Sequence, residues 1–340
     1  LTMTDPDASN SAKALYAYLQ GLTESDQVLF GHQNDVSHSV GNNDLGDVKD
    51  VTGSVSGIFG IDSLALFGSE AGGTDAASAL QNSIDYSKKA AQNGAIVTLS
   101  THMPNFTNAK IKKNADGTYD FYNCDFNEAK DLSGDSLKKI LPGGEKNEVF
   151  KAYLDTIAVY ANALEQENIP VIFRPFHEDT GGWFWWGNCE PESYKKLWNV
   201  MYDKMTNEHI LTNLIWVWNG QDPAWYPGDE TVDINGWDIY AGNHVDSSQS
   251  GRFDDMATNY GTKTKLIALT ENGCVMDPDK VFNDNARWLF WGTWSDPFTM
   301  KLGVVINDEY TTVELLTKAY NHERVLTLDE LPDLQNYPLD

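Results

Sequence analysis

Short apolar segments alternate with amphipathic segments along nearly the whole chain. The apolar segments are rich in β-branched residues and bounded by turn residues, which is typical of buried parallel strands. They cover residues 27–31, 57–62, 95–100, 169–173, 214–218, 234–240 and 265–270. Helical periodicity appears between several of them, at residues 76–93, 147–167, 192–207 and 311–320. Strands and helices in this alternation predict a parallel sheet.

Two segments compete for the position of an eighth strand. Residues 288–294 are rich in aromatic side chains, and residues 302–306 read Leu-Gly-Val-Val-Ile. The hydrophobic pattern alone favours residues 302–306. Either choice gives eight strands with helices between them, which predicts a closed (β/α)8 TIM barrel. An open doubly wound sheet is the alternative, and the lack of a glycine-rich phosphate loop after the first strand disfavours it.

The length of 340 residues, with 41% hydrophobic and 12% aromatic content, suits one large core. We therefore expect residues 1–340 to form a single barrel domain. Residues 103–146, approximately, are rich in Asn, Asp, Gly and Lys and have little periodicity. Because they follow the third strand, we predict a long loop on the catalytic face.

The charge balance excludes several classes of partner. Asp and Glu number 50 against 24 Lys and Arg, which gives a formal charge of -26. This field repels nucleic acid, acidic polysaccharides and anionic lipids, so we expect a neutral substrate. No apolar run approaches the ~18 residues that a membrane-spanning helix needs. We therefore expect neither nucleic acid nor a membrane as a partner.

Two glutamates lie at the C-terminal ends of predicted strands. Glu178 follows the fourth strand in the sequence Arg-Pro-Phe-His-Glu, and Glu271 ends the seventh in Ala-Leu-Thr-Glu-Asn-Gly. Catalytic residues of barrels occupy this end of the strands. A pair of carboxyl groups across the barrel mouth predicts glycoside hydrolysis, with Glu178 as the acid and Glu271 as the nucleophile. Apolar neighbours of Glu178 are expected to raise its pKa by desolvation.

Further polar residues are placed to support these two glutamates. His177 precedes the predicted acid, and we expect it to hydrogen-bond a sugar hydroxyl or the nucleophile. Asp238 and Tyr240 are two residues apart on the sixth strand, so they point to the same side. A hydroxyl donated by Tyr240 would hold Glu271 ionised and oriented. His102, after the third strand, is expected in the floor of the sugar site.

All tryptophans of the chain lie after residue 182. Indole faces stack well on the apolar faces of sugar rings, so tryptophans near strand ends predict a polysaccharide-binding trough. The tryptophans expected to face the cleft are Trp183, Trp186, Trp218 and Trp294. Trp198 and Trp288 are instead expected in the core.

Metal and cofactor motifs are missing from the sequence. There is no His-x-x-x-His, no Cys-x-x-Cys and no EF-hand spacing. A Gly-x-Ser-x-Gly motif for a serine nucleophile does not occur either. We therefore expect no metal and no cofactor in the reaction.

These motifs resemble those of glycoside hydrolase family 26, a clan A family dominated by endo-β-1,4-mannanases. The segment 174–178, followed by Trp-Phe-Trp-Trp-Gly at 183–187, is similar to the family's acid/base motif. Leu-Thr-Glu-Asn-Gly at 269–273 resembles its nucleophile motif, and residues 31–33 and 325–332 are similar to family sequences too. Asp179, Thr180 and Thr101 depart from the residues common in the family, at positions that border its sugar sites.

The resemblance implies a retaining endo-β-1,4-mannanase that acts on mannan, glucomannan or galactomannan. It implies Glu178 as acid/base and Glu271 as nucleophile, supported by His177, Asp238 and Tyr240. It also implies that His102, Trp183 and Trp294 line the subsites, and it moves the eighth strand to residues 288–294. A mixed-linkage β-glucanase or a β-1,3-xylanase of the same family remains an alternative. A non-catalytic carbohydrate-binding barrel is a third, disfavoured by the two glutamates.

The three cysteines permit at most one internal disulfide. Cys124 and Cys189 lie in loops after neighbouring strands, so we predict that they form a bridge and that Cys274 stays a free thiol. The sequon at Asn105-Phe-Thr is compatible with secretion. The chain begins Leu-Thr-Met, which we interpret as a processed form. We expect a secreted monomer.

Overall fold

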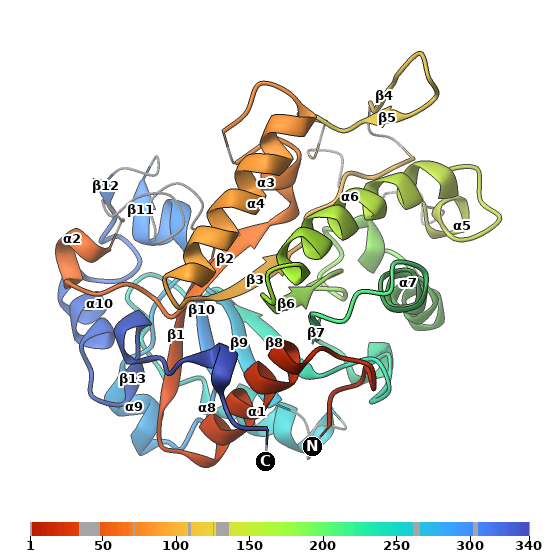
Figure 1. The fold of residues 1–340 in the computed structure, drawn as a ribbon. Coiled ribbons are helices and arrows are strands. Elements are labelled where there is room, and N and C mark those ends of the chain that lie inside the picture. Colours follow the sequence, from red (N-terminus) through yellow and green to blue (C-terminus); the bar gives the residue numbers. More distant parts are fainter. Residues whose placement is uncertain are drawn as a thin grey trace.

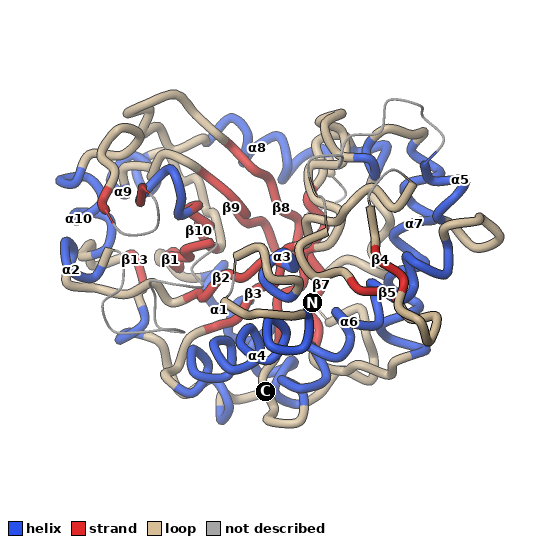
Figure 2. Tube along the Cα trace, turned by 90° about the horizontal axis from the view of Figure 1, so that it is seen from above, coloured by secondary structure: helices blue, strands red, loops and turns tan. Residues whose placement is uncertain are grey.

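Eight parallel strands form a closed ring at the centre of the molecule. The computed structural model describes residues 2–33, 48–70, 72–107, 110–124, 126, 136–260, 266–301 and 305–339. The strands of the ring are β1 (Val28–Gln33), β2 (Ile58–Asp62), β3 (Ile96–Ser100), β6 (Val171–Arg174), β7 (Leu214–Asn219), β8 (Ile234–Ile239), β9 (Leu266–Asn272) and β10 (Phe290–Trp294). Strand β1 pairs in parallel with both β2 and β10, which closes the ring (Figure 2). The predicted (β/α)8 barrel is confirmed.

Helices surround the barrel wall (Figure 1). The α-helices are α1 (Asn10–Glu24), α2 (Lys49–Thr52), α3 (Ser63–Leu66), α4 (Ala76–Gln92), α5 (Ser136–Ile140), α6 (Asn147–Glu165), α7 (Pro191–Asp203), α8 (Ser250–Asn259), α9 (Pro278–Asn283) and α10 (Val313–Tyr320). Short helical turns are η1 (Trp185–Gly187), η2 (Lys204–Glu208), η3 (Pro223–Trp225), η4 (Ser295–Thr299), η5 (Leu328–Glu330) and η6 (Leu334–Asn336). The predicted helices at 76–93 and 147–167 correspond to α4 and α6 within two residues at each end.

The eighth strand of the ring is β10, at the position that the family resemblance implied. The hydrophobic pattern alone favoured residues 302–306, and that choice was wrong. Residues 302–304 lie outside the described residues, and Val305–Ile306 forms the short strand β12, antiparallel to β11 (Met300–Lys301). The hydrophobic pattern misleads because β10 consists mainly of aromatic residues and a glycine and contains no run of aliphatic residues. Another short strand, β13 (Val325–Leu326), pairs with the start of β1.

Aliphatic side chains fill the N-terminal half of the barrel interior. Every strand of the ring contributes to this apolar cluster, through Leu29, Ile58, Ile96, Ile172, Ile215, Val217, Ile234, Leu266, Ala268 and Phe290. Helix α1 closes this end, with Leu15 and Leu19 packed in the same cluster. Ser9 caps the helix by accepting a hydrogen bond from the backbone N–H of Ala12. Both chain ends lie at this end of the barrel (Figure 1).

Side chains become small and then polar toward the C-terminal ends of the strands. Because inward positions repeat every second residue, Leu29, Gly31 and Gln33 of β1 face the interior in turn. Strands β2 and β8 repeat this aliphatic, glycine, polar sequence, ending at Asp62 and Asp238. The glycines are required: a Cβ atom on Gly60 would lie 2.2 Å from Oε1 of Gln33. The small middle layer thus makes room for long polar side chains above it.

The segment after β3 forms part of the rim at the C-terminal side of the barrel. Its described residues contain a hairpin of β4 (Lys112–Lys113) and β5 (Tyr119–Asp120), followed by α5. The hairpin projects away from the barrel (Figure 1). Asn105 of the predicted sequon is fully buried, and its Nδ2 donates to Ser136 Oγ at 3.2 Å. Folded protein therefore does not present this asparagine for glycosylation.

The predicted Cys124–Cys189 disulfide is wrong. Cys189 is a free thiol, and its Sγ lies 3.5 Å from the backbone oxygen of Trp186. Cys274 is free, as predicted. The prediction failed because two loops can follow neighbouring strands while their side chains point in different directions.

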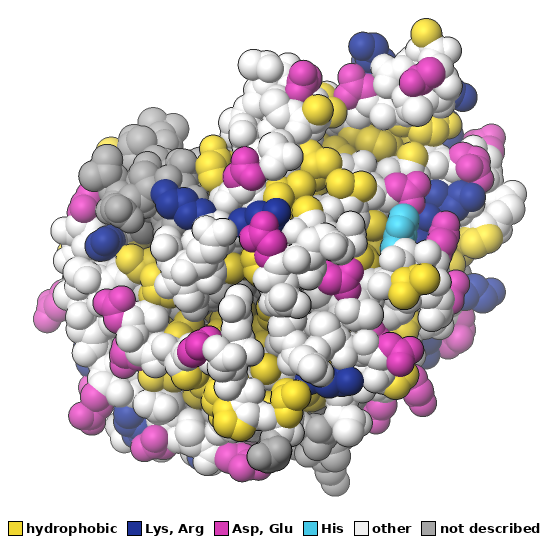
Figure 3. Space-filling model, viewed as in Figure 1, with side chains coloured by type: hydrophobic (Ala, Val, Ile, Leu, Met, Phe, Trp, Pro, Cys, Tyr) yellow, Lys and Arg dark blue, Asp and Glu magenta, His cyan; other side chains and the backbone are white. Residues whose placement is uncertain are grey.

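Acidic side chains are spread over the face of the molecule shown in Figure 3, as the net charge of -26 requires. Among the described residues, no helix has the length and apolar character needed to cross a membrane.

Candidate active site

Glu178 and Glu271 meet at the C-terminal mouth of the barrel. Glu271 is the sixth residue of β9, and Glu178 lies four residues beyond the end of β6. One carboxyl oxygen of Glu178 and one of Glu271 lie within 4.8 Å of each other. The structure therefore brings together the two glutamates that the sequence singled out.

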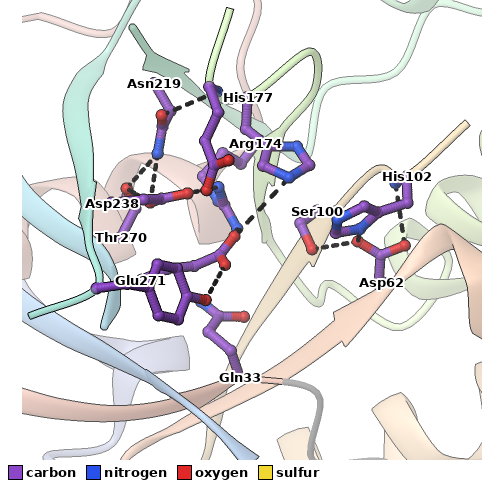
Figure 4. Close-up of polar contacts among 12 residues, drawn as sticks. Gln33, Asp62, Ser100, His102, Arg174, His177, Asn219, Asp238, Thr270 and Glu271 are labelled. Carbon is purple, nitrogen blue, oxygen red and sulfur yellow. Dashed lines mark hydrogen bonds and ion pairs between the residues drawn. The ribbon is translucent and has the colours of Figure 1, made fainter. Parts of the chain in front are cut away.

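A buried arginine binds the nucleophile candidate. Arg174, the last residue of β6, donates from Nη2 to Glu271 Oε2 and from Nη1 to Asp238 Oδ2 at 3.2 Å (Figure 4). All three side chains are nearly inaccessible to solvent. Burial opposes the charge of Arg174, but Asp238 and Glu271 more than offset this and raise the pKa of the guanidinium. Arg174 is therefore a permanent positive charge beside Glu271.

The other oxygen of Glu271 accepts a hydrogen bond from Tyr240. The distance from Tyr240 Oη to Glu271 Oε1 is 2.6 Å, which confirms the predicted contact. Tyr240 follows β8 directly and remains 44% exposed, so its ring borders the open cleft. The Phe298 ring, whose centroid is 5.0 Å away, supports it from the side.

An irregularity in β9 allows two successive residues to point into the barrel. The register with β8 shifts between Trp237 and Asp238, so that Asp238 is paired with Glu271. A bulge breaks the alternation of side chains. Thr270 therefore donates from Oγ1 to Asp238 Oδ1 at 2.6 Å, while the next residue, Glu271, reaches Arg174.

Asn219, at the end of β7, links this network to Glu178. Its Nδ2 donates to Asp238 Oδ1 and, at 2.6 Å, to Thr270 Oγ1 (Figure 4). Its Oδ1 accepts the backbone N–H of Glu178 at 3.1 Å. The amide can satisfy these partners in only one orientation, so it fixes the backbone of Glu178 relative to Asp238.

The environment of Glu178 favours its protonated form. Burial raises its pKa, and the negative charges of Asp238 and Glu271 raise it further. Trp183 donates from Nε1 to Glu178 Oε2 at 2.7 Å, which leaves the other oxygen for a proton. Burial and Asp238 raise the pKa of Glu271 as well, but Arg174, His102 and Tyr240 act in the opposite direction. When the pair holds a single proton, that proton therefore resides on Glu178.

His102 and Asp62 form a second ion pair beside the glutamates. His102 Nδ1 lies 2.7 Å from Asp62 Oδ2, and Ser100 Oγ donates to the same oxygen at 2.6 Å (Figure 4). Burial disfavours a charge on His102, but Asp62 outweighs it and raises the pKa of the imidazole to about 9. The negative charge of Glu271 acts in the same direction. His102 is thus an imidazolium at neutral pH.

His177 lies between His102 and the nucleophile candidate. Its ring centroid is 4.5 Å from that of His102, and its Nε2 lies 3.9 Å from Glu271 Oε2. Burial, together with the positive charges of His102 and Arg174, holds the pKa of His177 well below its usual range. A neutral His177 separates the two cations. His177, Glu178 and Glu271 each offer an atom suited to a metal ion, but Arg174 already supplies the positive charge that Glu271 needs.

Aromatic side chains lie around the two glutamates at the barrel mouth. Trp183 is 46% exposed, and Trp294 is partly exposed with its ring centroid 6.0 Å from that of His102. Trp186 and Trp218 are fully buried, contrary to the expectation that they face the cleft. Trp186 stacks under Phe184 at 4.4 Å, and Phe184 takes the position at the surface. Trp198 and Trp288 are buried, as predicted.

Sequence reasoning missed several residues of this site. It gave no role to Arg174, Asp62, Asn219 or Thr270. The rule that found Glu271 would also have found Asp62 and Asn219, because both are the last inward residue of a strand. Asp179, expected to border the sugar site, is instead fully buried, and so is Thr101.

Comparison with known proteins identifies the family. The sequence profile of glycosyl hydrolase family 26 matches residues 4–330. The chain belongs to this family. A mannan endo-1,4-beta-mannosidase of Thermothelomyces thermophilus is 41% identical over 184 residues, which are 54% of this chain and 36% of that protein. Mannan endo-1,4-beta-mannosidase B of a Piromyces species is 40% identical over 179 residues, covering 53% of this chain and 29% of the relative.

Solved structures of the family have the same fold. A modular endo-β-1,4-mannanase of Cellulomonas fimi superimposes with a TM-score of 0.81 at 27% sequence identity, covering 99% of this chain and 79% of that one. The alignments with the two curated relatives span about a third of those longer proteins.

We expect Asp62→Asn to remove the charge from His102. Without the Asp62 carboxylate, burial dominates and the pKa of His102 should fall from about 9 to below its ordinary value of 6.5. NMR titration of the histidine ring protons measures this shift. Because the folded-state pKa of His102 is raised and that of Asp62 is lowered, the pair stabilises the fold fully between pH 3.8 and 6.5, and this advantage over Asp62→Asn should disappear as the pH rises through 9.

Ser100→Ala provides the control for this prediction. It removes the hydrogen bond to Asp62 but leaves the negative charge in place. His102 should then still titrate near 9. An Asp62→Asn protein in which His102 also titrates near 9 would show that Asp62 is not the source of the shift.

Proposed function

We propose that this chain is a retaining endo-β-1,4-mannanase, which hydrolyses internal β-1,4-mannosidic bonds by double displacement. The observation that carries the proposal is the pair Glu178 and Glu271, with carboxyl oxygens within 4.8 Å and different electrostatic surroundings. Retaining glycosidases hold their two carboxyl groups about 5–5.5 Å apart, whereas inverting enzymes need about 6.5–9.5 Å to admit a water molecule.

The first displacement uses both glutamates at once. Glu271 attacks the anomeric carbon while Glu178 gives its proton to the departing glycosidic oxygen, so the bond breaks and a glycosyl ester with Glu271 forms. The Trp183 N–H donates to one oxygen of Glu178, so the proton that is transferred resides on the other oxygen. Arg174 and Tyr240 hold both oxygens of Glu271 in position for attack.

The second displacement releases the sugar. Glu178, now a carboxylate, removes a proton from water that attacks the anomeric carbon, and Glu271 leaves as a carboxylate. Arg174 and Tyr240 stabilise the negative charge that returns to Glu271. The second displacement returns the proton to Glu178 and the negative charge to Glu271, so the site ends in its starting protonation state.

The preference for mannan is supported by the relatives, which are named as mannan endo-1,4-beta-mannosidases. The exposed Trp183 and the partly exposed Trp294 flank the glutamates and provide stacking surfaces for successive sugar rings. His102 adds a charged donor for sugar hydroxyls. A polysaccharide cannot cross a membrane, so we propose that the enzyme works outside the cell. We propose that it acts as a monomer.

Release of reducing sugar from four polysaccharides tests the substrate. We expect activity on galactomannan and glucomannan, because the proposed site accepts the axial C2 hydroxyl of mannose. Lichenan and β-1,3-xylan should be cleaved at least about 10-fold more slowly, corresponding to a loss of about 1.4 kcal/mol in transition-state binding. Faster cleavage of lichenan or xylan would assign the chain to another activity of the family.

Glu271→Ala should abolish turnover while leaving the fold intact. Loss of the nucleophile removes the covalent pathway, and we expect a decrease in kcat on the order of 10⁴-fold or more. Initial rates on glucomannan and circular dichroism spectra measure the two effects. Glu190→Ala, which removes an exposed glutamate whose side chain does not cap α7, is the matched control and should retain wild-type rates. Activity of Glu271→Ala close to wild type would contradict the assignment.

The pH profile of kcat/KM should be bell-shaped. Activity requires ionised Glu271, so it is lost as the pH falls, and protonated Glu178, so it is lost as the pH rises. Because its surroundings raise the pKa of Glu178, the alkaline limb should lie well above the ordinary range of a carboxyl group. Glu178→Ala should lose this limb and about 10²–10⁴-fold in activity on polysaccharide.

The same variant should lose far less kcat/KM on aryl mannosides whose leaving group needs no proton, because this parameter reports only the first displacement. The ratio of these two losses separates an acid from a residue that only binds substrate. Equal losses on both substrates would rule out Glu178 as the acid.

A further inference from the structure

The peptide that carries Glu178 is anchored at each of five successive residues. The backbone oxygens of Phe176 and His177 accept hydrogen bonds, from Tyr194 Oη at 2.9 Å and from Trp186 Nε1 at 2.7 Å. The next three residues bond to the end of β7 instead. Glu178 N–H donates to Asn219 Oδ1, Asp179 Oδ2 accepts from Trp218 Nε1 at 3.0 Å, and Thr180 Oγ1 donates to Gln221 Oε1 at 3.3 Å.

This peptide has an unfavourable backbone conformation. Both Phe176 and Glu178 have a φ angle of +52°, in the left-handed region that non-glycine residues seldom occupy. Such a conformation persists only where surrounding contacts enforce it. The orientation of the Glu178 side chain therefore depends on its anchors, and the side chain of Asp179 is the anchor next to it.

Asp179 occupies a closely fitting, buried cradle. The side chain is fully buried, and a Cβ atom on Gly220 would lie 2.6 Å from Asp179 Oδ2. A Cβ atom on Gly187 would come within 1.8 Å of the Asp179 backbone oxygen. Two glycines thus permit the close approach. Asp179 is fully buried, and although backbone N–H groups of Thr180 and Gln221 lower the pKa of its carboxyl group, the effect of burial is larger and raises it.

We propose that Asp179 is a positioning residue for the acid/base glutamate: its side chain, fixed between Gly220 and Trp218, holds the strained backbone of Glu178 so that the Glu178 carboxyl faces Glu271. This inference rests on the proposed function, because it concerns the acid of that reaction. Asp179 lies behind Glu178 and away from the cleft, so it acts on the reaction only through its neighbour. Burial raises the pKa of Asp179 to about 8, which makes it a neutral carboxyl group at neutral pH.

An asparagine at this position tests the role without a change of shape. Asp179→Asn keeps an oxygen that can accept from Trp218 Nε1 and is neutral, as the carboxyl group is at neutral pH. It should retain at least half of the wild-type kcat on glucomannan. Asp179→Ala removes the anchor, and a displacement of the acid by about 1 Å should lower kcat about 10²-fold. KM should change little, because no residue that contacts the sugar is altered.

The leaving group provides the readout that a general loss of structure would not give. If Asp179→Ala displaces the acid, its loss of kcat/KM, which reports the first displacement, should be large on glucomannan and small on an aryl mannoside with a good leaving group, as expected for Glu178→Ala. Asp233→Ala is the matched control. Asp233 is also a fully buried aspartate, but it lies at the start of β8 and accepts backbone N–H groups from Thr4 and Trp216. That variant should melt at a lower temperature and show the wild-type ratio of rates on the two substrates.

The outcomes separate this inference from the proposed function. Wild-type protein without activity on any mannan would refute the proposed function itself. Active wild-type protein, together with an Asp179→Ala variant that loses equal activity on both substrates or loses none, would overturn the role of Asp179 alone. Failure of Asp179→Asn to restore the rate would overturn it too, provided that the variant melts at the wild-type temperature.

Discussion

The close arrangement of carboxyl groups at the mouth of the barrel depends on the buried positive charge of Arg174. Arg174 lies between Asp238 and Glu271, and Glu178 stands close by, so three carboxyl groups share a space with little access to water. Without the guanidinium, the cost of burying these charges would drive protons onto them, and Glu271 would lose its nucleophilic form. The arginine is therefore as necessary to the chemistry as the glutamates, although it transfers no atom. Its hydrogen bonds also link β6 to β8 and β9, so the same ion pairs help to hold these strands together.

The apolar contacts that stabilise the barrel and the polar residues of the site lie at opposite ends of the same strands. The apolar layer and helix α1 bury apolar surface at one end. The other end carries buried ions whose net contribution to stability is small or unfavourable, as is usual for charges removed from water. The barrel tolerates this polar end because each strand continues from it into a well-packed apolar end.

The sequence predicted the features that local patterns determine. Strand positions, Glu178, Glu271 and the Tyr240 contact follow from the period of a strand and from the rule that barrel chemistry lies at strand ends. Contacts made by loops could not be predicted from these local patterns. Trp186 and Phe184 differ by two residues, and only the path of the chain after Glu178 decides which one is buried. The direction of Cys189, the burial of Asp179 and the pairing of His102 with Asp62 depend in the same way on how separate segments meet.

The glycines of the middle layer have a consequence for variation within such a barrel. Gly31, Gly60, Gly236 and Gly292 leave no space for a Cβ atom, because backbone or side-chain atoms already lie within 2.5 Å of where it would stand. The backbone of these glycines thus limits how far the polar side chains can extend into the barrel. In the proposed function, a sugar ring can approach Glu178 and Glu271 only to that depth. Changes in substrate range are consequently confined to the rim, where the loops can lengthen or change without disturbing the layers beneath.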